Sequence, residues 1–343
     1  MTIPIIDKAI IDSLIGNKVG PYHSFNPVSE TQIWQWCSVV GDQNLLFNSP
    51  EYRRQNNISS SLAPPSMMQM WTMRDVNDNY APGSTSQRPY KVFDDMTALG
   101  YESNVAVSYD ITFERYLTVG ERALHHTSIV SISEQKKTAL GIGYFVTEKV
   151  EYSTNEDISF ATALITYFQY HANEKTKTGD KTPKKISKEK IESSNVGGSS
   201  KSFTPVNIAL NTIKAGTTLP DLSIPITHKL IVAGAIASQD FIPIHHNIVA
   251  ANNAAMPDIF MNILTTCGLS ARYISDWAGP SSRLKKLQFN LMTPNFPDDN
   301  MLMQGSVTAI NQQTDGASVD IEFTGNNSIG PHVIGSATIA VTD

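Results

Sequence analysis

The sequence of 343 residues predicts an α+β fold that contains two copies of one unit. In each half, an apolar segment with helical features precedes a series of strands separated by turn residues, an order typical of α+β domains. Three pairs of residues recur at equivalent places in the two halves: Asp42 with Asp240, Pro64 with Pro257, and Ser128 with Ser306. Self-similarity of this kind indicates that the unit is duplicated.

The stretch 174–202 separates the two halves. It holds eight lysines and four acidic residues but no aromatic residue, so it cannot bury enough apolar surface to fold. We expect a flexible linker between an N-terminal unit, residues 1–173, and a C-terminal unit, residues 203–343. An anchor for anionic lipid is the alternative, which the interspersed acids disfavour.

The C-terminal unit is expected to begin with a strand at HKLIVAGA, residues 228–235, which leads into ASQDFIPIHH. A helix is expected over 257–277, because apolar residues recur there at helical spacing and Pro257 suits a first turn. The pattern then changes to that of strands, which we expect over four segments: 284–292, 301–310, 317–325 and 333–341.

The N-terminal unit is expected to repeat this order. LAPPSMMQMWTM, residues 62–73, predicts an apolar helix that begins with proline. Four strands are expected after it: 105–113, 122–132, 140–152 and 160–168. The insert 74–100 is rich in turn-forming residues, and we favour a long loop over a lid for it.

The strongest local signal for chemistry is the segment Asp240-Phe-Ile-Pro-Ile-His245. A carboxylate and an imidazole five residues apart, around a proline, can converge on one water molecule and move its proton. On spacing alone, a helix-capping aspartate and a surface histidine in an approach loop are the simpler interpretation of the pair. We assign the base to His245 rather than to its neighbour His246.

These residues resemble a known family. ASQDFIPIHH and the following DIFMN…TT.G…RY..DW.GP are similar to the MaoC-type hydratase/dehydratases of the hotdog superfamily, whose R-specific enoyl-CoA hydratases carry a G-D-x-N-P-L-H signature. The first half, from WCSVVGDQN to ALGIGYFVTEK, resembles the dehydratase-like hotdog that pairs with such domains. The resemblance implies a tandem hotdog fold in which each half is a long central helix wrapped by an antiparallel sheet.

The departures from the signature are informative. Ile242 stands where the family has an orienting asparagine, and Gln239 replaces the glycine before Asp240. In the first half, Phe47 takes the place of the histidine, although Asp42 retains the carboxylate. Without a histidine, that half cannot run the same acid–base chemistry. We therefore expect one working site, in the C-terminal unit.

The resemblance also implies the remaining site residues. Adding water to an unsaturated thioester places negative charge on the carbonyl oxygen, which a free backbone N–H at a helix start can stabilise. That donor is expected near Met261, with Asn262, Phe47 and Met67 as further substrate-binding residues. The methionines of 62–73 are adaptable enough to form an acyl-chain wall, although a role as ordinary core is the simpler interpretation.

The function implied is that of a lyase that reversibly hydrates a trans-2-enoyl-CoA to a 3-hydroxyacyl-CoA, using water activated by Asp240 and His245. The coenzyme A thioester is the substrate, the N-terminal unit shapes the acyl pocket, and neither a separate cofactor nor a metal is expected. Two alternatives stay open: a 3-hydroxyacyl-ACP dehydratase, and a non-catalytic acyl-thioester-binding subunit that needs a partner chain.

Composition limits partners and location. The chain has 26 Lys and Arg against 32 Asp and Glu, a net charge of −6, which provides no basic surface for nucleic acid. It contains no apolar run of bilayer length, no basic region before an apolar core at its start, and only Cys37 and Cys267. We expect a cytoplasmic protein that neither binds nucleic acid nor inserts into membranes. It is expected to form a homodimer or to associate with another hotdog subunit.

Overall fold

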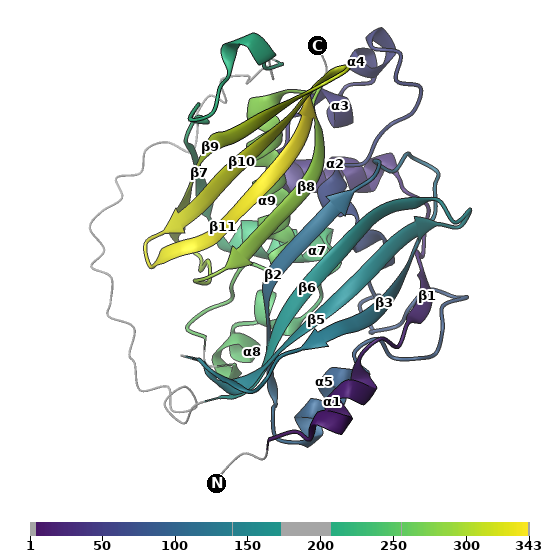
Figure 1. The fold of residues 1–343 in the computed structure, drawn as a ribbon, viewed down its shortest axis with the longest axis vertical. Coiled ribbons are helices and arrows are strands. Elements are labelled where there is room, and N and C mark those ends of the chain that lie inside the picture. Colours follow the sequence, from purple (N-terminus) through teal and green to yellow (C-terminus); the bar gives the residue numbers. More distant parts are fainter. Residues whose placement is uncertain (1–4, 139, 173–206, 255, 342–343) are drawn as a thin grey trace.

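The computed structural model describes residues 5–138, 140–172, 207–254 and 256–341. The stretch 174–202, expected to be a linker, lies outside the described residues. Two sheets join edge to edge in one curved layer, and helices lie against it (Figure 1). The α-helices are α1 (Lys8–Leu14), α2 (Glu30–Val40), α3 (Leu45–Asn48), α4 (Pro50–Gln55), α5 (Lys91–Ala98), α7 (His228–Ala237), α8 (Ile248–Asn253) and α9 (Ile263–Ala278).

The N-terminal sheet is antiparallel and follows the order β1-β3-β5-β6-β2. Its strands are β1 (Val19–His23), β2 (Ser103–Phe113), β3 (Ala123–Ile132), β5 (Gly141–Thr154) and β6 (Ser159–Ala172), with the short β4 (Lys136–Lys137) beside β5. Residues of β5 alternate between buried and partly exposed, so one side of the strand faces the core. The four strands expected from the sequence here are confirmed within one or two residues at most ends, and within four at the end of β6.

The C-terminal sheet follows the order β7-β9-β10-β11-β8. Its strands are β7 (Leu222–Ile226), β8 (Arg283–Leu291), β9 (Asp299–Gln313), β10 (Gly316–Asn327) and β11 (Gly330–Val341). The five strands of each sheet can be numbered in the order in which they occur in the chain, without the short β4. Across both sheets, their order in space is then first, third, fourth, fifth, second. This shared order confirms the duplication that the sequence predicts.

The two sheets meet where β2 pairs with β8. Their antiparallel register runs from Ser108 opposite Asn290 to Thr112 opposite Lys286, and the figure shows the two strands side by side (Figure 1). Each of these strands would otherwise be an unpaired sheet edge. Pairing through the sheets therefore satisfies the backbone groups of both edge strands.

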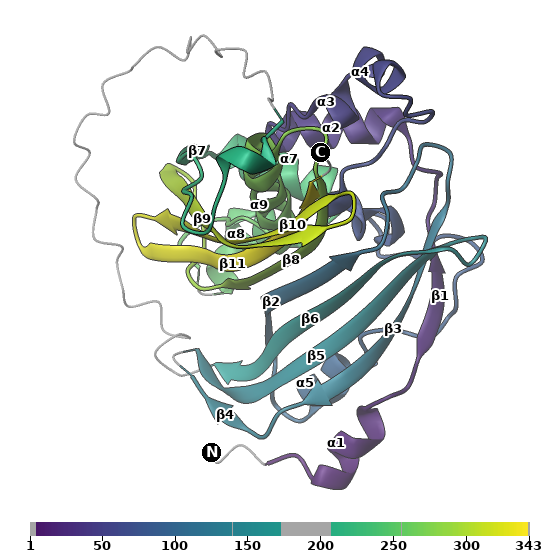
Figure 2. The same ribbon diagram turned by 45° about the horizontal axis from the view of Figure 1, so that its top comes forward.

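Helix α9 lies against the C-terminal sheet, and α7 and α2 pack against α9 and against each other (Figure 2). Helix α9 is buried on nearly every side, which fits its apolar composition. A Cβ added at Gly268 would lie 2.4 Å from the Trp36 ring, so only glycine lets α9 approach α2 this closely. A Cβ at Gly234 would likewise lie 2.2 Å from Thr265, which explains the close contact of α7 with α9.

Two predictions for the C-terminal half, one of a strand and one of a helix, are corrected by the structure. The expected strand 228–235 is helix α7, which begins after Thr227, whose side chain accepts a hydrogen bond from the N–H of Leu230. The helix expected over 257–277 begins only at Ile263, because Asn262 rather than Pro257 provides its N-terminal cap.

The helix expected over 62–73 is also wrong in detail. The segment forms two short 3₁₀ turns, η1 (Pro65–Met67) and η2 (Met70–Thr72), separated by Met68 and Gln69. The apolar run is short and lies between Pro64-Pro65 and a polar insert. A regular helix of this length has little stability of its own, so tertiary packing determines the conformation of the segment. The insert 74–100 is more than a loop, because it contains α5.

Among the described residues, no helix is both long enough and apolar enough to cross a membrane.

Candidate active site

Asp240 is placed by the way α7 ends. Gln239 adopts the left-handed conformation, with φ of 57°, and its N–H donates to the carbonyl of Ile236. The N–H of Asp240 then donates to the carbonyl of Ala235 at 2.9 Å. This pair of bonds is the Schellman arrangement, which closes a helix and fixes the direction of the next residue. The carboxylate is therefore held against the start of α9 and is only 6% exposed.

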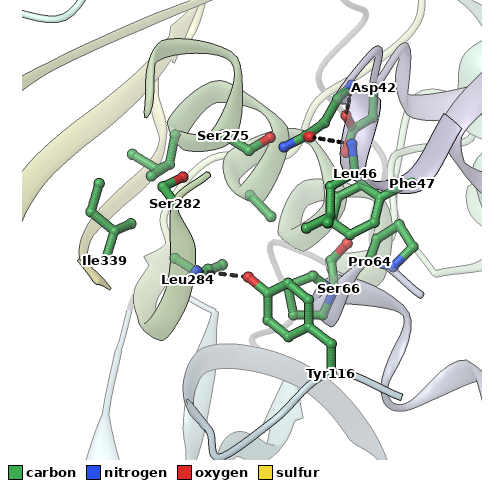
Figure 3. A pocket seen from close by; sticks show the side chains of 14 residues that line it. Asp42, Leu46, Phe47, Pro64, Ser66, Tyr116, Ser275, Ser282, Leu284 and Ile339 are labelled. Carbon is green, nitrogen blue, oxygen red and sulfur yellow. Dashed lines mark hydrogen bonds between the residues drawn. The ribbon is translucent and has the colours of Figure 1, made fainter. Parts of the chain in front are cut away.

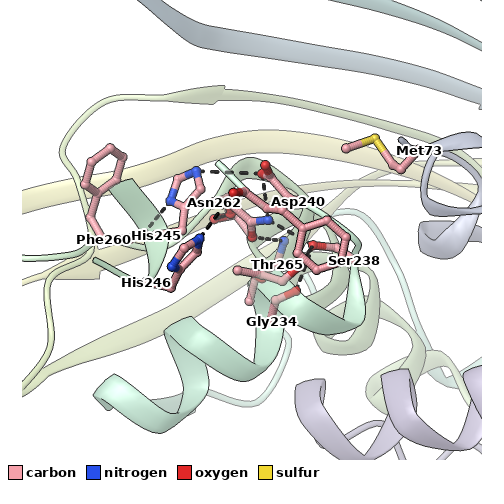
Figure 4. Close-up of polar contacts among 12 residues, drawn as sticks. Met73, Gly234, Ser238, Asp240, His245, His246, Phe260, Asn262 and Thr265 are labelled. Atoms are coloured by element: carbon pink, nitrogen blue, oxygen red, sulfur yellow. Dashed lines mark hydrogen bonds and ion pairs between the residues drawn. The ribbon is translucent and has the colours of Figure 1, made fainter. Parts of the chain in front are cut away.

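His245 lies at the end of a short 3₁₀ turn, η4 (Pro243–His245), and is also 6% exposed. Its Nδ1 lies 2.7 Å from the carbonyl oxygen of Phe260. A carbonyl only accepts hydrogen bonds, so Nδ1 carries the proton and Nε2 presents a lone pair. Nε2 lies 3.7 Å from Oδ2 of Asp240 (Figure 4). The two groups that the spacing singled out therefore converge, as expected.

Asn262 fixes the orientation of Asp240. Its side-chain nitrogen donates to Oδ2 of Asp240 and to Oγ of Ser238, both at 2.9 Å. Its side-chain oxygen accepts the N–H of Thr265 at 2.9 Å and so caps α9. Since the cap requires oxygen on that side, the amide nitrogen must face Asp240. Asn262 thus supplies the orienting amide that Ile242 cannot.

The electrostatics suit proton transfer from water. Burial lowers the pKa of His245, although the nearby Asp240 carboxylate and the Phe260 carbonyl act in the opposite direction. Oδ1 of Asp240 is buried, and no described residue hydrogen-bonds to it. A free carboxylate oxygen beside an unprotonated Nε2 forms a place where one water molecule can donate a hydrogen bond to each.

Asp240 and His245 line a pocket of about 460 Å³ that extends into the N-terminal half. The N-terminal residues that line it include Gln69, Met73, Arg74, Tyr90, Phe93, Asn104, Tyr109 and Tyr167. A pocket of this volume is in the usual range for small-molecule sites. Because the wall includes residues from the insert 74–100, the insert helps to form the pocket.

The structure does not bring all the expected substrate-binding residues to this pocket. Asn262 and Met261 line it, but Phe47 and Met67 do not. Met67 is fully buried in the core, and Phe47 lies in another cavity. Of the four methionines in 62–73, Met73 lines the pocket. The interpretation of the others as ordinary core agrees with their burial.

The position expected for the oxyanion donor is also corrected. The N–H of Met261 donates to the carbonyl of Asn295 at 3.0 Å, so it is not free. Because α9 begins at Ile263, the backbone N–H groups of Ile263 and Leu264 belong to its first turn, and no described residue accepts a hydrogen bond from them. Both residues line the pocket beside Asp240.

The first half keeps the outline of the same site. Helix α2 ends at Gly41, with φ of 72°, and the N–H of Asp42 donates to the carbonyl of Cys37. Asp42 thus occupies the position of Asp240, and Phe47 that of His245. The cavity around them measures about 20 Å³ and is lined by Tyr116 and neighbouring side chains (Figure 3). That space is too small for an acyl thioester, in line with the expectation of one working site.

The other histidines lie apart from this arrangement. Nε2 of His246 lies 3.2 Å from the carbonyl of Phe241, and its side chain is exposed. His125 and His126 lie on β3, where neighbouring residues face opposite sides. Within the described ranges, no group of three or more His, Cys, Asp or Glu residues is arranged to hold a metal ion.

Sequence reasoning missed some contributors to the pocket. The carbonyl of Phe260 has no side-chain signal, and its role depends on the extended segment before α9. Gln69, Tyr109 and Tyr167 come from the N-terminal half, and Tyr109 donates to Oε1 of Gln69 at 2.5 Å. Tyr109 lies on β2 and Tyr167 on β6. Only the period-two pattern, which places both on the inner face of the sheet, could have indicated that they line the pocket.

Comparison with known proteins agrees with this architecture. Residues 13–162 match the family described as "FAS1-like, dehydratase domain region". The 3-oxo-4,17-pregnadiene-20-carboxyl-CoA hydratase beta subunit of Mycobacterium tuberculosis is 37% identical over 128 residues, which is 37% of this chain and 96% of that protein. A "Probable enoyl-CoA hydratase alpha subunit" of Thermomonospora curvata is 34% identical over 142 residues, 40% of this chain. The chain spans 43% of the length of that alpha subunit.

Solved structures support the fold. A MaoC-like dehydratase superposes with a TM-score of 0.71 at 15% identity, covering 97% of this chain and 100% of the other. A protein from Mycobacterium tuberculosis described as having a double hotdog fold gives a TM-score of 0.63 at 12% identity, covering 99% and 98% of the two chains. The shared strand order, the Asp240–His245 pair and these similarities lead to one conclusion: the chain belongs to the MaoC-like hydratase/dehydratases and has the double hotdog fold.

Proposed function

We propose that this protein is a lyase that reversibly adds water to a trans-2-enoyl-CoA, giving a 3-hydroxyacyl-CoA. The observation that carries the proposal is the gap of 3.7 Å between Nε2 of His245 and Oδ2 of Asp240, where the large pocket meets the C-terminal half. Neither Nε2 of His245 nor Oδ1 of Asp240 makes a hydrogen bond to a described residue that would prevent it from binding water. The names of the two relatives, both hydratases of CoA thioesters, support the reaction class.

In the proposed reaction, water lies between Nε2 of His245 and the free Oδ1 of Asp240. Nε2 takes a proton from water as its oxygen bonds to C3 of the enoyl group, and the electron pair of the double bond moves toward the thioester carbonyl. The proton then returns to C2 from the catalytic pair, so that one water molecule is added in total. In reverse, the same groups remove water.

The negative charge that develops on the thioester oxygen needs donors. We assign this role to the backbone N–H groups of Ile263 and Leu264, at the positive end of the 16-residue helix α9. Loss of one such donor in comparable sites lowers the rate by about a hundredfold or more. The side chain of Ile263 does not prevent this role, since the donor belongs to the backbone.

The pocket volume suits a substantial acyl chain rather than a short one. The relative from Mycobacterium tuberculosis is named for a steroid-derived acyl-CoA, which makes bulky acyl groups reasonable candidates for this chain too. The proposal needs neither a metal nor a separate cofactor, because the thioester itself makes C3 electrophilic.

The proposal also covers the group that carries the acyl chain and the association of this chain with other subunits. An acyl carrier protein in place of coenzyme A would leave the chemistry unchanged and is the closest alternative. The relatives are named as alpha and beta subunits, and we propose that this chain too associates, either with a second copy or with another hotdog subunit. We further propose a cytoplasmic location and expect no nucleic-acid partner.

The decisive experiment follows loss of the enoyl-thioester absorbance with the purified full chain. We expect hydration of trans-2-enoyl-CoA, with His245→Ala and Asp240→Asn each lowering turnover by about a hundredfold or more. His246→Ala is the matched control and should keep near-native turnover, since its ring lies outside the pocket.

The opposite results would be equally clear. If the folded wild-type chain binds an enoyl-CoA but never hydrates it, the protein is a binding subunit, and activity should then appear only with a partner chain. If His246→Ala is inactive while His245→Ala is not, the base has been assigned to the wrong histidine.

A further inference from the structure

Glu148 is an unusual member of the buried face of β5. The alternation along this strand places it in line with Val146 and Val150, and it is 2% exposed. Thr127 donates a hydrogen bond from its hydroxyl to Oε1, and Tyr167 donates to Oε2 at 3.3 Å. Among the described residues, no lysine or arginine forms an ion pair with it. A carboxylate without a cation is costly to bury, so its retention needs an explanation.

The surroundings of Glu148 are rich in hydroxyl groups. Burial raises the pKa of six tyrosines in this region, and the nearby charge of Glu148 acts in the same direction on each: Tyr22, Tyr80, Tyr90, Tyr109, Tyr152 and Tyr167. Burial in turn raises the pKa of Glu148 to about 7. Near neutral pH the carboxyl group therefore occurs both protonated, as a hydrogen-bond donor, and ionised, as an acceptor.

A small cavity of about 40 Å³ opens beside Glu148. His125, Tyr80 and Tyr152 also line it, and Nδ1 of His125 is buried without a hydrogen-bond partner among the described residues. Burial lowers the pKa of His125 to about 3, so its ring is neutral. The cavity has room for about one or two water-sized groups, and Nδ1 of His125 is an unsatisfied polar atom in its wall.

This cavity adjoins the large pocket. Five residues line both spaces: Gln69, Met73, Arg74, Tyr90 and Ile165. Tyr167 forms a second connection, because it lines the large pocket while its hydroxyl binds Glu148. Met73 and Asp240 both face the large pocket, and Figure 4 shows Met73 on the opposite side of Asp240 from His245. The cavity thus continues the acyl pocket away from the catalytic pair.

We propose that the cavity beside Glu148 is a binding site for an oxygen atom at the far end of the acyl group, so that the substrates are acyl thioesters with a distal hydroxyl or carbonyl group. Glu148 and His125 provide the recognition. The ionised carboxylate and Nδ1 of His125 accept from a hydroxyl, and the protonated carboxyl donates to a carbonyl. An acyl chain that ends in a hydrocarbon group would displace water from Glu148 and His125 without replacing the hydrogen bonds of that water. This inference rests on the proposed function, whose substrate class it narrows.

The test compares trans-2-enoyl-CoA thioesters in matched sets of several chain lengths, each set ending in a hydroxyl, a ketone or a methyl group. Sites built to bind a substrate oxygen discriminate strongly against analogues that lack it. At the chain length that reaches the cavity, kcat/KM should favour an oxygenated substrate by at least about tenfold. Equal values for all three ends at every length would overturn the proposal while leaving the hydratase function intact.

Glu148→Leu should remove the preference. Leucine suits the row formed by Val146 and Val150 and removes a buried carboxylate that has no cation, although the hydroxyls of Thr127 and Tyr167 lose their acceptor. His125→Phe keeps the ring that stacks on Tyr22, with 4.8 Å between centroids, but loses Nδ1. This variant should also reduce the preference for oxygenated substrates, and it provides the test if Glu148→Leu does not fold. If the folded variants keep the full preference for oxygenated substrates, the assignment of Glu148 and His125 as the binding groups is wrong.

Glu151→Gln is the matched control. Glu151 lies on the same strand but is partly exposed and pairs with Lys18 and Lys149, each at 3.0 Å. Its substitution should leave the preference unchanged. Calorimetry with saturated acyl-CoA thioesters, with and without the distal oxygen, tests the site separately from catalysis. Tighter binding of the oxygenated acyl-CoA without any hydration would support this site and reject the proposed function, whereas equal affinities would reject the site.

Discussion

The side-chain amide of Asn262 joins the Asp240 carboxylate to the start of α9: its nitrogen donates to Oδ2 of Asp240 at 2.9 Å, while its oxygen accepts the N–H of Thr265 at 2.9 Å. One residue therefore fixes both the direction of the carboxylate and the position of the helix whose free N–H groups line the pocket. These two roles can be separated by mutation.

Asn262→Ser should keep the helix cap but lose the bond to Asp240, because serine caps helices well and is too short to reach the carboxylate. We expect turnover to fall by about tenfold or more, with KM changed less than kcat, while the melting temperature shifts little. Asn44→Ser is the matched control, since Asn44 caps α3 in the N-terminal half. Similar turnover in the two variants would show that Asn262 does not position Asp240.

The pH dependence of hydration should reflect His245. Burial lowers its pKa below the ordinary value of 6.5, so Nε2 stays unprotonated, and able to accept a proton, down to a pH below 6.5. On acidification, kcat/KM should therefore fall with a midpoint below 6.5. Titration of the imidazole by NMR in the resting protein should give the same direction. A midpoint above 6.5 would contradict the geometry described for this ring.

Asp42→Asn should leave turnover within a few-fold and stabilise the protein at neutral pH. Burial raises the pKa of Asp42 from its ordinary value of 3.8 to about 6, so its ionised form is unfavourable in the folded state. The penalty is absent below pH 3.8, grows as the pH rises to about 6, and is constant above. Denaturant unfolding should show a gain of about 1–3 kcal/mol at about pH 7 that shrinks toward about pH 4. A loss of turnover as large as that of Asp240→Asn would overturn the assignment of a single site.

Gln239→Gly should raise stability by up to about 1 kcal/mol. A residue with a Cβ in the left-handed conformation costs roughly 1–2 kcal/mol, part of which the greater flexibility of unfolded glycine offsets. The reverse change in the other half, Gly41→Gln, should destabilise, because a Cβ there would lie 2.6 Å from the guanidinium of Arg272. Thermal unfolding of both variants checks the pair, and a lower melting temperature for Gln239→Gly would refute the argument.

Most of the fold follows from patterns along the sequence. Strands β5 and β10 alternate between core and surface over most of their length, and this period of two is typical of a half-buried strand. Helix α7 resembles a strand in the sequence because HKLIVAGA is largely apolar and lacks a period that distinguishes the two structures. The N-terminal cap by Thr227 and the packing of Gly234 on α9 decide in favour of the helix, and the second of these depends on neighbours in space.

The site is predictable only where its residues are close in sequence. Asp240 and His245 form a local motif, whereas Asn262 reaches Asp240 from 22 residues away, and the sequence indicates a different role for it. Met261 is expected to offer a free N–H, but the carbonyl of Asn295, on a distant loop, already accepts it. The first turn of α9 depends on the cap at Asn262, which the conspicuous Pro257 obscures. Tertiary contacts of this kind leave no periodic trace in a sequence.

The pairing of β2 with β8 bears on how the chain loses its structure. Neither half is complete by itself: separation would leave two bare sheet edges and would uncover Trp36 and the face of α9 around Gly268. A chain of two similar units can unfold in two steps, but units that share a sheet and a helix interface lose their contacts together. We therefore expect one cooperative transition. The N-terminal half then sets the lifetime of the C-terminal one, so that a mutation far from Asp240 and His245 can abolish activity simply by shortening the time the chain stays folded.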